Sequence, residues 1–116
     1  MRYDERVPTL FTRIIQGEIP AEIVYQNEHV VAFRDNQPQA PVHIVLVPRQ
    51  EIPGLAEVPD EGDHRHLLNA ARRVAELMGL TNGYRLVINQ GEDGGQSVPH
   101  LHAHLLGGRP LAWPPG

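Results

Sequence analysis

Two segments of the chain carry apolar residues at helical spacing. Residues 9–20, "TLFTRIIQGEIP", predict a short helix with Thr9 as its N-cap and Gly17 at its end. Residues 61–78 predict a long helix, with Asp60 as a possible cap and Gly79 as the stop. The predicted apolar faces consist of Leu10, Phe11, Ile14 and Ile15 in the first helix, and Leu67, Leu68, Ala71, Val74, Ala75 and Met78 in the second.

Five further segments have the β-branched or alternating pattern of strands. Residues 22–35, "EIVYQNEHVVAFRD", predict a hairpin that turns at residues 26–28. "VHIVLVP" (42–48), "YRLVIN" (84–89) and "PHLHAHLL" (99–106) predict three more strands. Because the connections are short, the expected fold class is α+β, with a five-stranded, mostly antiparallel sheet, one long helix and one short helix. We find no internal repeat, and expect a flexible arm over residues 1–8 followed by a single domain over 9–116.

The last of these strands contains three histidines at alternate positions, in "HLHAHLL" (100–106). Alternation places His100, His102 and His104 on one strand face and the intervening apolar residues on the other. Neighbouring imidazoles would then lie roughly 6.6 Å apart and the outer pair about 13 Å apart. One zinc ion, with its ligands at ~2.0–2.1 Å, cannot bind all three from a straight strand. Two of them together with His43 could bind zinc, and a solvated strand face is the simplest alternative.

Composition narrows the class of protein. The chain has 116 residues, 41% of them hydrophobic, which is a globular composition small enough for a partner subunit to help bury surface. The net charge of −4 argues against non-specific nucleic-acid binding, and the absence of cysteine excludes disulfides and thiolate chemistry. Since no apolar run approaches ~18 residues and the amino terminus does not resemble a secretory signal, we expect a cytoplasmic protein with no membrane contact.

A glycine-rich segment, "NQGEDGGQSV" (89–98), lies just before the histidines. Gly91, Gly94 and Gly95 would let backbone N–H groups form an anion-binding nest. Asn89, Gln96 and Ser97 add neutral donors, while Glu92 and Asp93 should face water at the loop tip. Glycine pairs are common in ordinary turns, but beside aligned histidines this segment predicts a phosphate site.

Imidazoles next to a phosphate site indicate nucleophilic attack at phosphorus. Neutral imidazole is abundant at pH 7, because its pKa lies near 6.5. His102, in the middle of the row, is the expected nucleophile. His104 and Ser97 are placed to hold phosphate oxygens and to help protonate a leaving amine.

These motifs resemble the histidine triad (HIT) superfamily, whose signature is His-φ-His-φ-His-φ-φ with φ apolar. The similarity to the Hint branch continues through "LFTRIIQGEIPAEIVYQNEHVVAFRDNQPQAPVHIVLVPR", "GYRLVINQGEDGGQSVPHLHAHLLGGR" and the terminal "WPPG". It extends over residues 9–116, in which residues 50–65 are uninformative. It implies a HIT-like fold and a purine nucleoside phosphoramidase that needs no metal or cofactor.

The resemblance also implies roles for individual residues. His102 matches the nucleophile that forms a covalent nucleotidyl-histidine, and His43 and His100 match supporting histidines. The remaining matches are His104, Ser97 and Asn89 with the α-phosphate and leaving group, Gly95 and Gln96 in the phosphate loop, Asp35 with the ribose hydroxyls, and Phe11, Ile14 and Phe33 in the purine slot. Asn36 stands where this branch commonly has an apolar residue against the base. Without the family, Asp35 would be a turn residue, and His43 and the slot residues ordinary core.

The expected activity is hydrolysis of the P–N bond in an adenosine or guanosine 5′-phosphoramidate. The alternatives are a nucleotide-binding regulatory or interaction protein with incidental hydrolysis, a dinucleoside polyphosphate hydrolase, and a zinc-binding protein. The resemblance further implies a homodimer, with Trp113 of the tail "GGRPLAWPPG" reaching the partner's active site and the substrate's leaving group. A tail in which Trp113 packs on its own subunit is the alternative.

Overall fold

The computed structural model describes residues 7–62 and 64–116. The elements follow in the order α1 (Leu10–Ile15), β1 (Ile23–Gln26), β2 (Val30–Arg34), β3 (Val42–Pro48), the 3₁₀ turn η2 (Leu55–Glu57), α2 (Arg65–Leu77), β4 (Tyr84–Val87) and β5 (Ala103–Gly107). The predicted α+β class, with five strands, one long helix and one short helix, is confirmed. The predicted arm over residues 1–8 falls mostly outside the described residues, so its flexibility stays a prediction.

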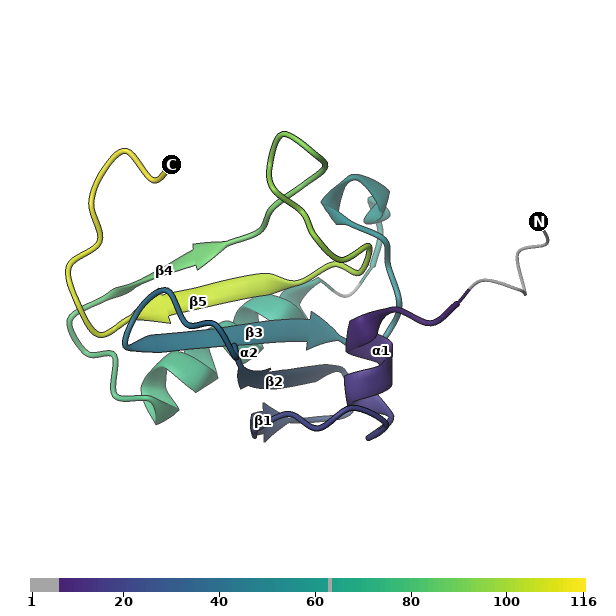
Figure 1. Ribbon diagram of the computed structural model, residues 1–116, viewed down its shortest axis with the longest axis horizontal. Coiled ribbons are helices and arrows are strands. Elements are labelled where there is room, and N and C mark those ends of the chain that lie inside the picture. The colour runs from purple at the N-terminus through teal and green to yellow at the C-terminus, as the bar shows by residue number, and fades with distance from the viewer. Residues whose placement is uncertain (1–6, 63) are drawn as a thin grey trace.

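The five strands form one antiparallel sheet in the order β1-β2-β3-β5-β4 (Figure 1). β5 pairs with β3 on one side and with β4 on the other. In the β3–β5 ladder, Val45 lies opposite His104 and His43 lies two residues before Val45. Because strand side chains alternate with a period of two, this register brings the His43 and His104 side chains to the same face of the sheet.

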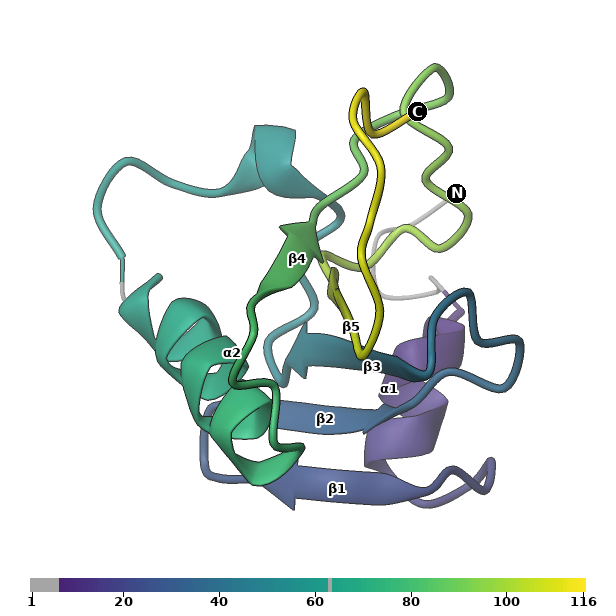
Figure 2. The same cartoon turned by 90° about the vertical axis from the view of Figure 1, so that its left-hand side faces the viewer.

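The two helices cover opposite faces of the sheet (Figure 2). β2 and β3 alternate between these faces, so each strand contributes to two apolar clusters. The cluster under α2 contains Val30, Ala32, Ile44, Leu46, Leu67, Ala70, Ala71, Val74, Ala75, Leu101, Ala103 and Leu105. The cluster under α1 contains Phe11, Ile14, Val31, Phe33, Val45 and Val47. The α1 face is also the face that carries His43 and His104.

Three of the four residues predicted to cap or end the helices do so in the structure. Thr9 caps α1, since its hydroxyl accepts a hydrogen bond from Thr12 N–H, and Gly17 (φ +79°) and Gly79 (φ +71°) follow the two helices in the left-handed region that favours glycine. The predicted start of α2 is wrong. The helix begins at Arg65, and the N-cap position is His64, not Asp60. A helix from residue 61 would contain Gly62 in its first turn, at a cost of roughly 1 kcal/mol.

Exposure differs from the predicted helix faces at two leucines. Leu10 in α1 is 46% exposed and Leu68 in α2 is 59% exposed, although both belong to the predicted apolar faces. Their neighbours Phe11 and Leu67 are buried instead. Each helix therefore buries a narrower stripe than the sequence pattern predicts. No helix in the described ranges is long and apolar enough to cross a membrane.

The last strand is shorter than predicted. β5 begins at Ala103, and residues 99–102 precede it as irregular chain. Pro99 has no N–H to donate to a ladder, and Leu101 N–H donates to Ile52 O at 2.6 Å, away from the neighbouring strand. His100 and His102 are consequently buried, and only His104 lies in the strand and is half-buried. The prediction that all three histidines share one strand face is therefore wrong, and so is the alternative of a solvated strand face for His100 and His102.

Candidate active site

His102 is held by the backbone just before it. Its Nδ1 lies 2.7 Å from His100 O, and because a carbonyl oxygen only accepts, Nδ1 carries the proton. The neutral ring then has its lone pair on Nε2. His102 is 4% exposed and packs edge-on against Phe11, with ring centroids 4.8 Å apart. The structure thus fixes one tautomer, the one that presents a nucleophilic Nε2.

A second chain of hydrogen bonds fixes His104. Gln39 N–H donates to His43 Nδ1 at 3.0 Å, which leaves the proton of neutral His43 on Nε2. That Nε2–H faces His104 Nδ1 at 2.9 Å and Asp35 Oδ2 at 3.4 Å. His104 Nδ1 therefore accepts, and its own proton sits on Nε2. The His102 and His104 rings are 5.1 Å apart, so a nucleophilic nitrogen and an N–H donor stand on neighbouring rings.

Burial favours the neutral forms of His43 and His104. It lowers the pKa of His43, although the Asp35 carboxylate raises that pKa in part. Burial also lowers the pKa of His104, and repulsion from His102 and His43 adds to the effect against the attraction of Asp35. The two rings can therefore donate and accept hydrogen bonds while they remain uncharged, as the chemistry of neutral imidazole requires.

His100, two residues before His102, is fully buried. Its Nε2–H donates to Pro48 O at 2.9 Å, and its Nδ1 lies 2.8 Å from the Thr9 hydroxyl. Burial lowers the pKa of His100, partly offset by the Pro48 hydrogen bond and by Glu51. The His100 ring is therefore closed off from solvent, and its carbonyl oxygen is the hydrogen-bond partner of His102.

The predicted slot residues lie on the α1 side of the sheet, where Phe11 contacts the His102 ring. Phe11 and Phe33 have ring centroids 5.7 Å apart, and both belong with Ile14 to the apolar cluster under α1. All three are buried. They are core residues whose cluster reaches the His102 ring through Phe11, so the core and slot interpretations apply to the same side chains.

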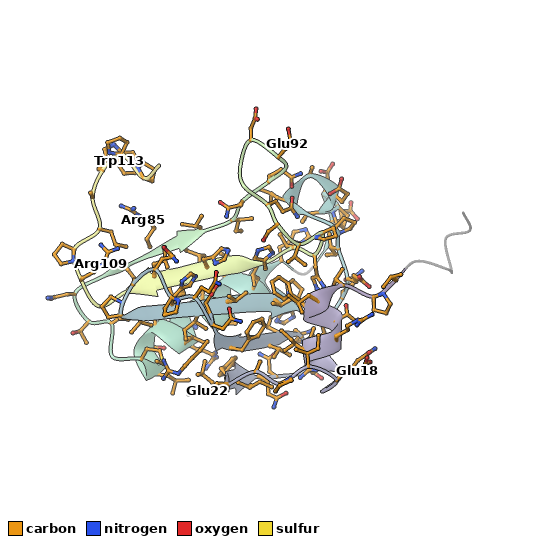
Figure 3. The ribbon with its side chains drawn as sticks, in the orientation of Figure 1. Glu18, Glu22, Arg85, Glu92, Arg109 and Trp113 are labelled. Carbon is orange, nitrogen blue, oxygen red and sulfur yellow. The ribbon has the colours of Figure 1, made fainter. Side chains whose placement is uncertain are left out.

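The glycine-rich loop is braced by its glutamine. Gln96 Oε1 accepts from Gly91 N–H at 2.9 Å, and its amide donates to Pro53 O at 2.8 Å and Val98 O at 3.1 Å. Gly95 has φ +79°, and Ser97 is exposed. The backbone N–H groups of Gly95 and Gln96 also brace the loop, since they donate to Glu92 O and Gly91 O, both at 3.0 Å. Glu92 and Asp93 are exposed, and Glu92 stands at the loop tip (Figure 3), as expected.

Of the remaining predicted residues, only Asp35 is shown in contact with one of these histidines. Asn89 is half-buried and Asn36 is exposed. Asp35 lies against His43, and its other oxygen accepts from Gln37 N–H at 2.8 Å. Trp113 is 81% exposed and stands away from the sheet (Figure 3), so the alternative in which it packs on its own subunit is wrong.

Comparison with known proteins places this geometry in one family. The HIT domain model matches residues 16–111. The chain belongs to the HIT family. It is 56% identical over 110 residues to an uncharacterized HIT-like protein of Synechococcus elongatus, an alignment that covers 93% of this chain and 96% of that one.

Solved structures of HIT proteins have the same fold. A HIT family hydrolase from Legionella pneumophila superposes with a TM-score of 0.91 at 45% identity, covering 94% of this chain and 100% of the other. A histidine triad protein from Clostridium difficile gives a TM-score of 0.88 at 39% identity, covering 93% and 96% of the two chains. The similarity therefore spans nearly the whole of this HIT protein.

One group of side chains in the described part of this HIT protein has the spacing of metal ligands. Ligand atoms of Asp35, His43 and His104 lie within 4.8 Å of one another. Only one of them is a triad histidine, so the zinc alternative with two triad histidines and His43 does not match this group. The same atoms are joined by the hydrogen bonds that set the two tautomers, so a metal would have to displace the proton between His43 and His104.

Sequence reasoning misses the partners that orient these rings. Three of them are backbone groups, namely His100 O, Pro48 O and Gln39 N–H. Backbone groups leave no trace in residue type, so no signal in the sequence identifies them. Thr9 is recognisable only as a helix cap, and its contact with His100, 91 positions away, cannot be read from the sequence.

Proposed function

We propose that this HIT protein is a hydrolase of purine nucleoside 5′-phosphoramidates, acting on the P–N bond of AMP- or GMP-amine conjugates. The observation that carries the proposal is the tautomer of His102, whose Nδ1–H is committed to His100 O and whose Nε2 lone pair is available. Membership of the family and the likeness to a HIT family hydrolase support hydrolase-type chemistry.

In the proposed reaction, His102 Nε2 attacks the α-phosphorus and the P–N bond breaks. The amine leaves with a proton, and the nucleotide stays bonded through phosphorus to His102 Nε2. Water then attacks the same phosphorus and the P–Nε2 bond breaks, which releases the nucleoside monophosphate and restores the His102 lone pair. One proton of the water replaces the proton that the side-chain donor gave to the amine. His104 Nε2–H and the Ser97 hydroxyl are the proposed donors to the phosphate oxygens and the leaving nitrogen.

Substrate recognition follows from the surrounding groups. We propose that the purine contacts the cluster of Phe11, Ile14 and Phe33, with Asn36 at its edge. Asp35 is the proposed acceptor for ribose hydroxyls, and Asn89 and Ser97 would hold the phosphate. Gly95 and Gln96, whose N–H groups donate to Glu92 O and Gly91 O, would shape the loop beside it. None of these groups requires a cofactor or metal ion.

We further propose a cytoplasmic homodimer. In the described chain, β4 pairs on one side with β5 and forms one edge of the sheet, the kind of edge that proteins cover or pair. Pairing two β4 edges would extend the sheet across a twofold axis. The exposed Trp113 would then lie near the partner's site, where it would contact the leaving group.

Turnover of a fluorogenic adenosine phosphoramidate, measured with and without EDTA, tests the function. We expect full activity after exhaustive chelation. Loss of activity that zinc restores would favour a metal enzyme. Nucleotide binding without turnover would leave a binding protein, and faster cleavage of a dinucleoside polyphosphate would favour that class of hydrolase.

Replacement of His102 tests the nucleophile. Because His102 is buried, His102→Ala leaves a cavity, so His102→Asn is the matched variant, with an amide N–H that can still donate to His100 O. Both should abolish turnover while the Asn variant keeps AMP binding, and quenched wild type should carry a nucleotide adduct on His102. An active His102→Asn protein of normal melting temperature would contradict the mechanism.

A further inference from the structure

Thr9 joins helix α1 to the triad. Its hydroxyl oxygen accepts from Thr12 N–H at 3.1 Å, which caps the helix. The same hydroxyl lies 2.8 Å from His100 Nδ1, and Glu51 Oε1 accepts the Thr9 N–H at 3.2 Å. A helix cap needs only the first of these contacts. The second ties the cap to a fully buried histidine.

The proton on each of these atoms can be assigned. Pro48 O faces His100 Nε2, so Nε2 carries the proton of the neutral ring and Nδ1 must accept. The Thr9 hydroxyl is therefore the donor to Nδ1. The other acceptor near Thr9 Oγ1 is the Thr12 hydroxyl oxygen, which lies farther away at 3.2 Å. Helix capping uses a lone pair of Thr9 Oγ1, whereas the contact with His100 uses its hydrogen.

The contact continues to the nucleophile. His100 O accepts the Nδ1–H of His102 at 2.7 Å, so the placement of the His100 backbone sets the direction of the His102 lone pair. We propose that Thr9 is a positioning residue for His102, and that its hydroxyl does so by holding the His100 ring in its Nε2–H form between Thr9 and Pro48. The expected effect of Thr9 on turnover rests on the proposed function. The expected effect of Thr9 on the His100 tautomer does not.

A matched pair of substitutions separates capping from positioning. Aspartate is as good an N-cap as threonine, but its carboxylate can only accept, so Thr9→Asp keeps the cap and removes the donor to His100. Asparagine has nearly the same shape and carries an N–H that can donate, and Thr9→Ser restores the hydroxyl itself. Arg13→Gly weakens α1 at an exposed position without touching His100.

The first readout is the ring ¹⁵N spectrum of His100 in the free protein. In wild type and Thr9→Ser we expect an unprotonated Nδ1 and a protonated Nε2. In Thr9→Asp we expect Nδ1 to be protonated, because it then faces a carboxylate. This spectrum reports on His100 whether or not a phosphoramidate is the substrate, so failure of the proposed function would not obscure it.

The second readout is turnover of the adenosine phosphoramidate. We expect kcat of Thr9→Asp to fall on the order of 10²-fold with little change in KM, as misplacement of a reacting group does. Thr9→Asn should lose less, and Thr9→Ser should be the most active of the three. Arg13→Gly should lower the melting temperature with an unchanged His100 spectrum and unchanged kcat.

Two results would overturn the proposal. One is a Thr9→Asp protein with the wild-type His100 spectrum and wild-type kcat. The other is a loss of kcat that Arg13→Gly reproduces at the same loss of melting temperature, since this would show a purely structural role. If Thr9→Asp does not fold, Thr9→Val takes its place, although it lacks both the cap and the donor. Its kcat is then compared with that of Arg13→Gly at the same melting temperature, and equal losses of kcat would overturn the proposal.

Discussion

Hydrogen-bond partners decide which ring nitrogen carries the proton in each histidine of the site. These partners lie outside the triad motif or belong to the backbone of the motif. The histidines are His43, His100, His102 and His104. His102 and His100 donate to carbonyl oxygens, and His43 accepts from a backbone N–H. Each ring is thereby committed to one neutral tautomer. This arrangement gives neighbouring imidazoles different chemistry, since one presents a lone pair and another presents an N–H.

The division of roles between His104 and Ser97 is testable with leaving groups. If these residues protonate the amine, His104→Ala and Ser97→Ala should each lose part of a contribution worth ~10²–10⁴-fold in kcat, and the loss should shrink for amines that are already acidic. The measurement is a series of adenosine phosphoramidates with leaving groups of graded basicity. Equal losses along the series would leave only phosphate binding for that residue.

Buried neutral histidines also make the fold sensitive to acid. The pKa values of His43, His100 and His104 are lowered from 6.5 in the folded protein, so below pH 6.5 the unfolded chain binds protons first. Stability should therefore fall as pH drops from 6.5 toward the lowered pKa values, each histidine contributing a slope of at most about 1.4 kcal/mol per pH unit. Above pH 6.5 this contribution is fully present.

Urea unfolding at a series of pH values above about 5, where carboxylates titrate little, measures this slope. His100→Gln should show a shallower dependence than wild type, because it removes one of the three groups. His29→Gln, at an exposed position, serves as the control. A wild-type stability that stays flat or rises on acidification in this range would contradict the linkage.

Residue identity is the part of the site that the sequence reveals well. The triad, the glycine-rich loop and Asp35 all stand out in the sequence, and the structure brings His43, His104 and Asp35 together. Burial of His100 and His102 is not visible there, because it depends on Pro99 and on the contact of Leu101 with Ile52, far away along the chain. An alternating pattern predicts a strand but cannot show where the ladder stops.

At the scale of elements, the glycine-rich loop must keep its shape for the proposed phosphate site to exist. Gly95 has φ +79°, and no atom lies within 4 Å of the position that a Cβ would take. Gly95→Ala therefore adds only backbone strain of about 1–2 kcal/mol. A Cβ at Gly94 would collide with the backbone of Gln90. We therefore expect Gly94→Ala to displace the loop and raise the KM for the phosphoramidate more than Gly95→Ala does.

Unfolding midpoints and KM values for the two variants check this expectation, with Glu92→Ala at the exposed loop tip as the control. Glu92→Ala should change stability by less than about 0.5 kcal/mol. If Gly94→Ala raised KM no more than the control, the loop would not form the phosphate site. If Gly94→Ala changed only the stability of the protein, the role of the loop would be limited to folding.

Element prediction succeeds where local signals are strong. The hairpin of β1 and β2 and strand β3 match the sequence, because β-branched runs and polar turns agree there. The predicted start of α2 is too early, because the sequence offers a capping residue at Asp60 whereas the helix begins after Gly62, at an N-cap without a side-chain hydrogen bond. The side chain of His64 does not cap the helix, and its Nε2 lies 2.7 Å from Pro59 O.

At the scale of the whole molecule, the carboxyl-terminal tail extends from the sheet rather than folding back on it (Figure 1). Arg85 in β4 donates to Ala112 O at 2.8 Å, which fixes the tail at the same edge strand that we propose for dimerisation. Trp113 is left 81% exposed. A large exposed indole is costly in water, which supports a role in contact with another molecule.

Deletion of residues 110–116 tests that role. The truncated protein should remain a dimer and hydrolyse a simple phosphoramidate, but its preference among bulky amines should change. Trp113→Ala should reproduce the change and Trp113→Phe should reduce it. Unchanged relative rates would exclude a specificity role, and dissociation into monomers in size-exclusion chromatography would assign the tail to assembly.

The two-sided packing of β2 and β3 has a consequence for how this protein tolerates variation. In β2, Val31 and Phe33 face the α1 cluster, while Val30 and Ala32 face the α2 cluster. Under the proposed function, neighbouring codons are under different selection, one for the fit of a ligand and the next for survival of the fold. A mutational scan should show a fitness profile with a period of two along this strand, and a change of preferred substrate should concentrate its tolerated substitutions at every second position.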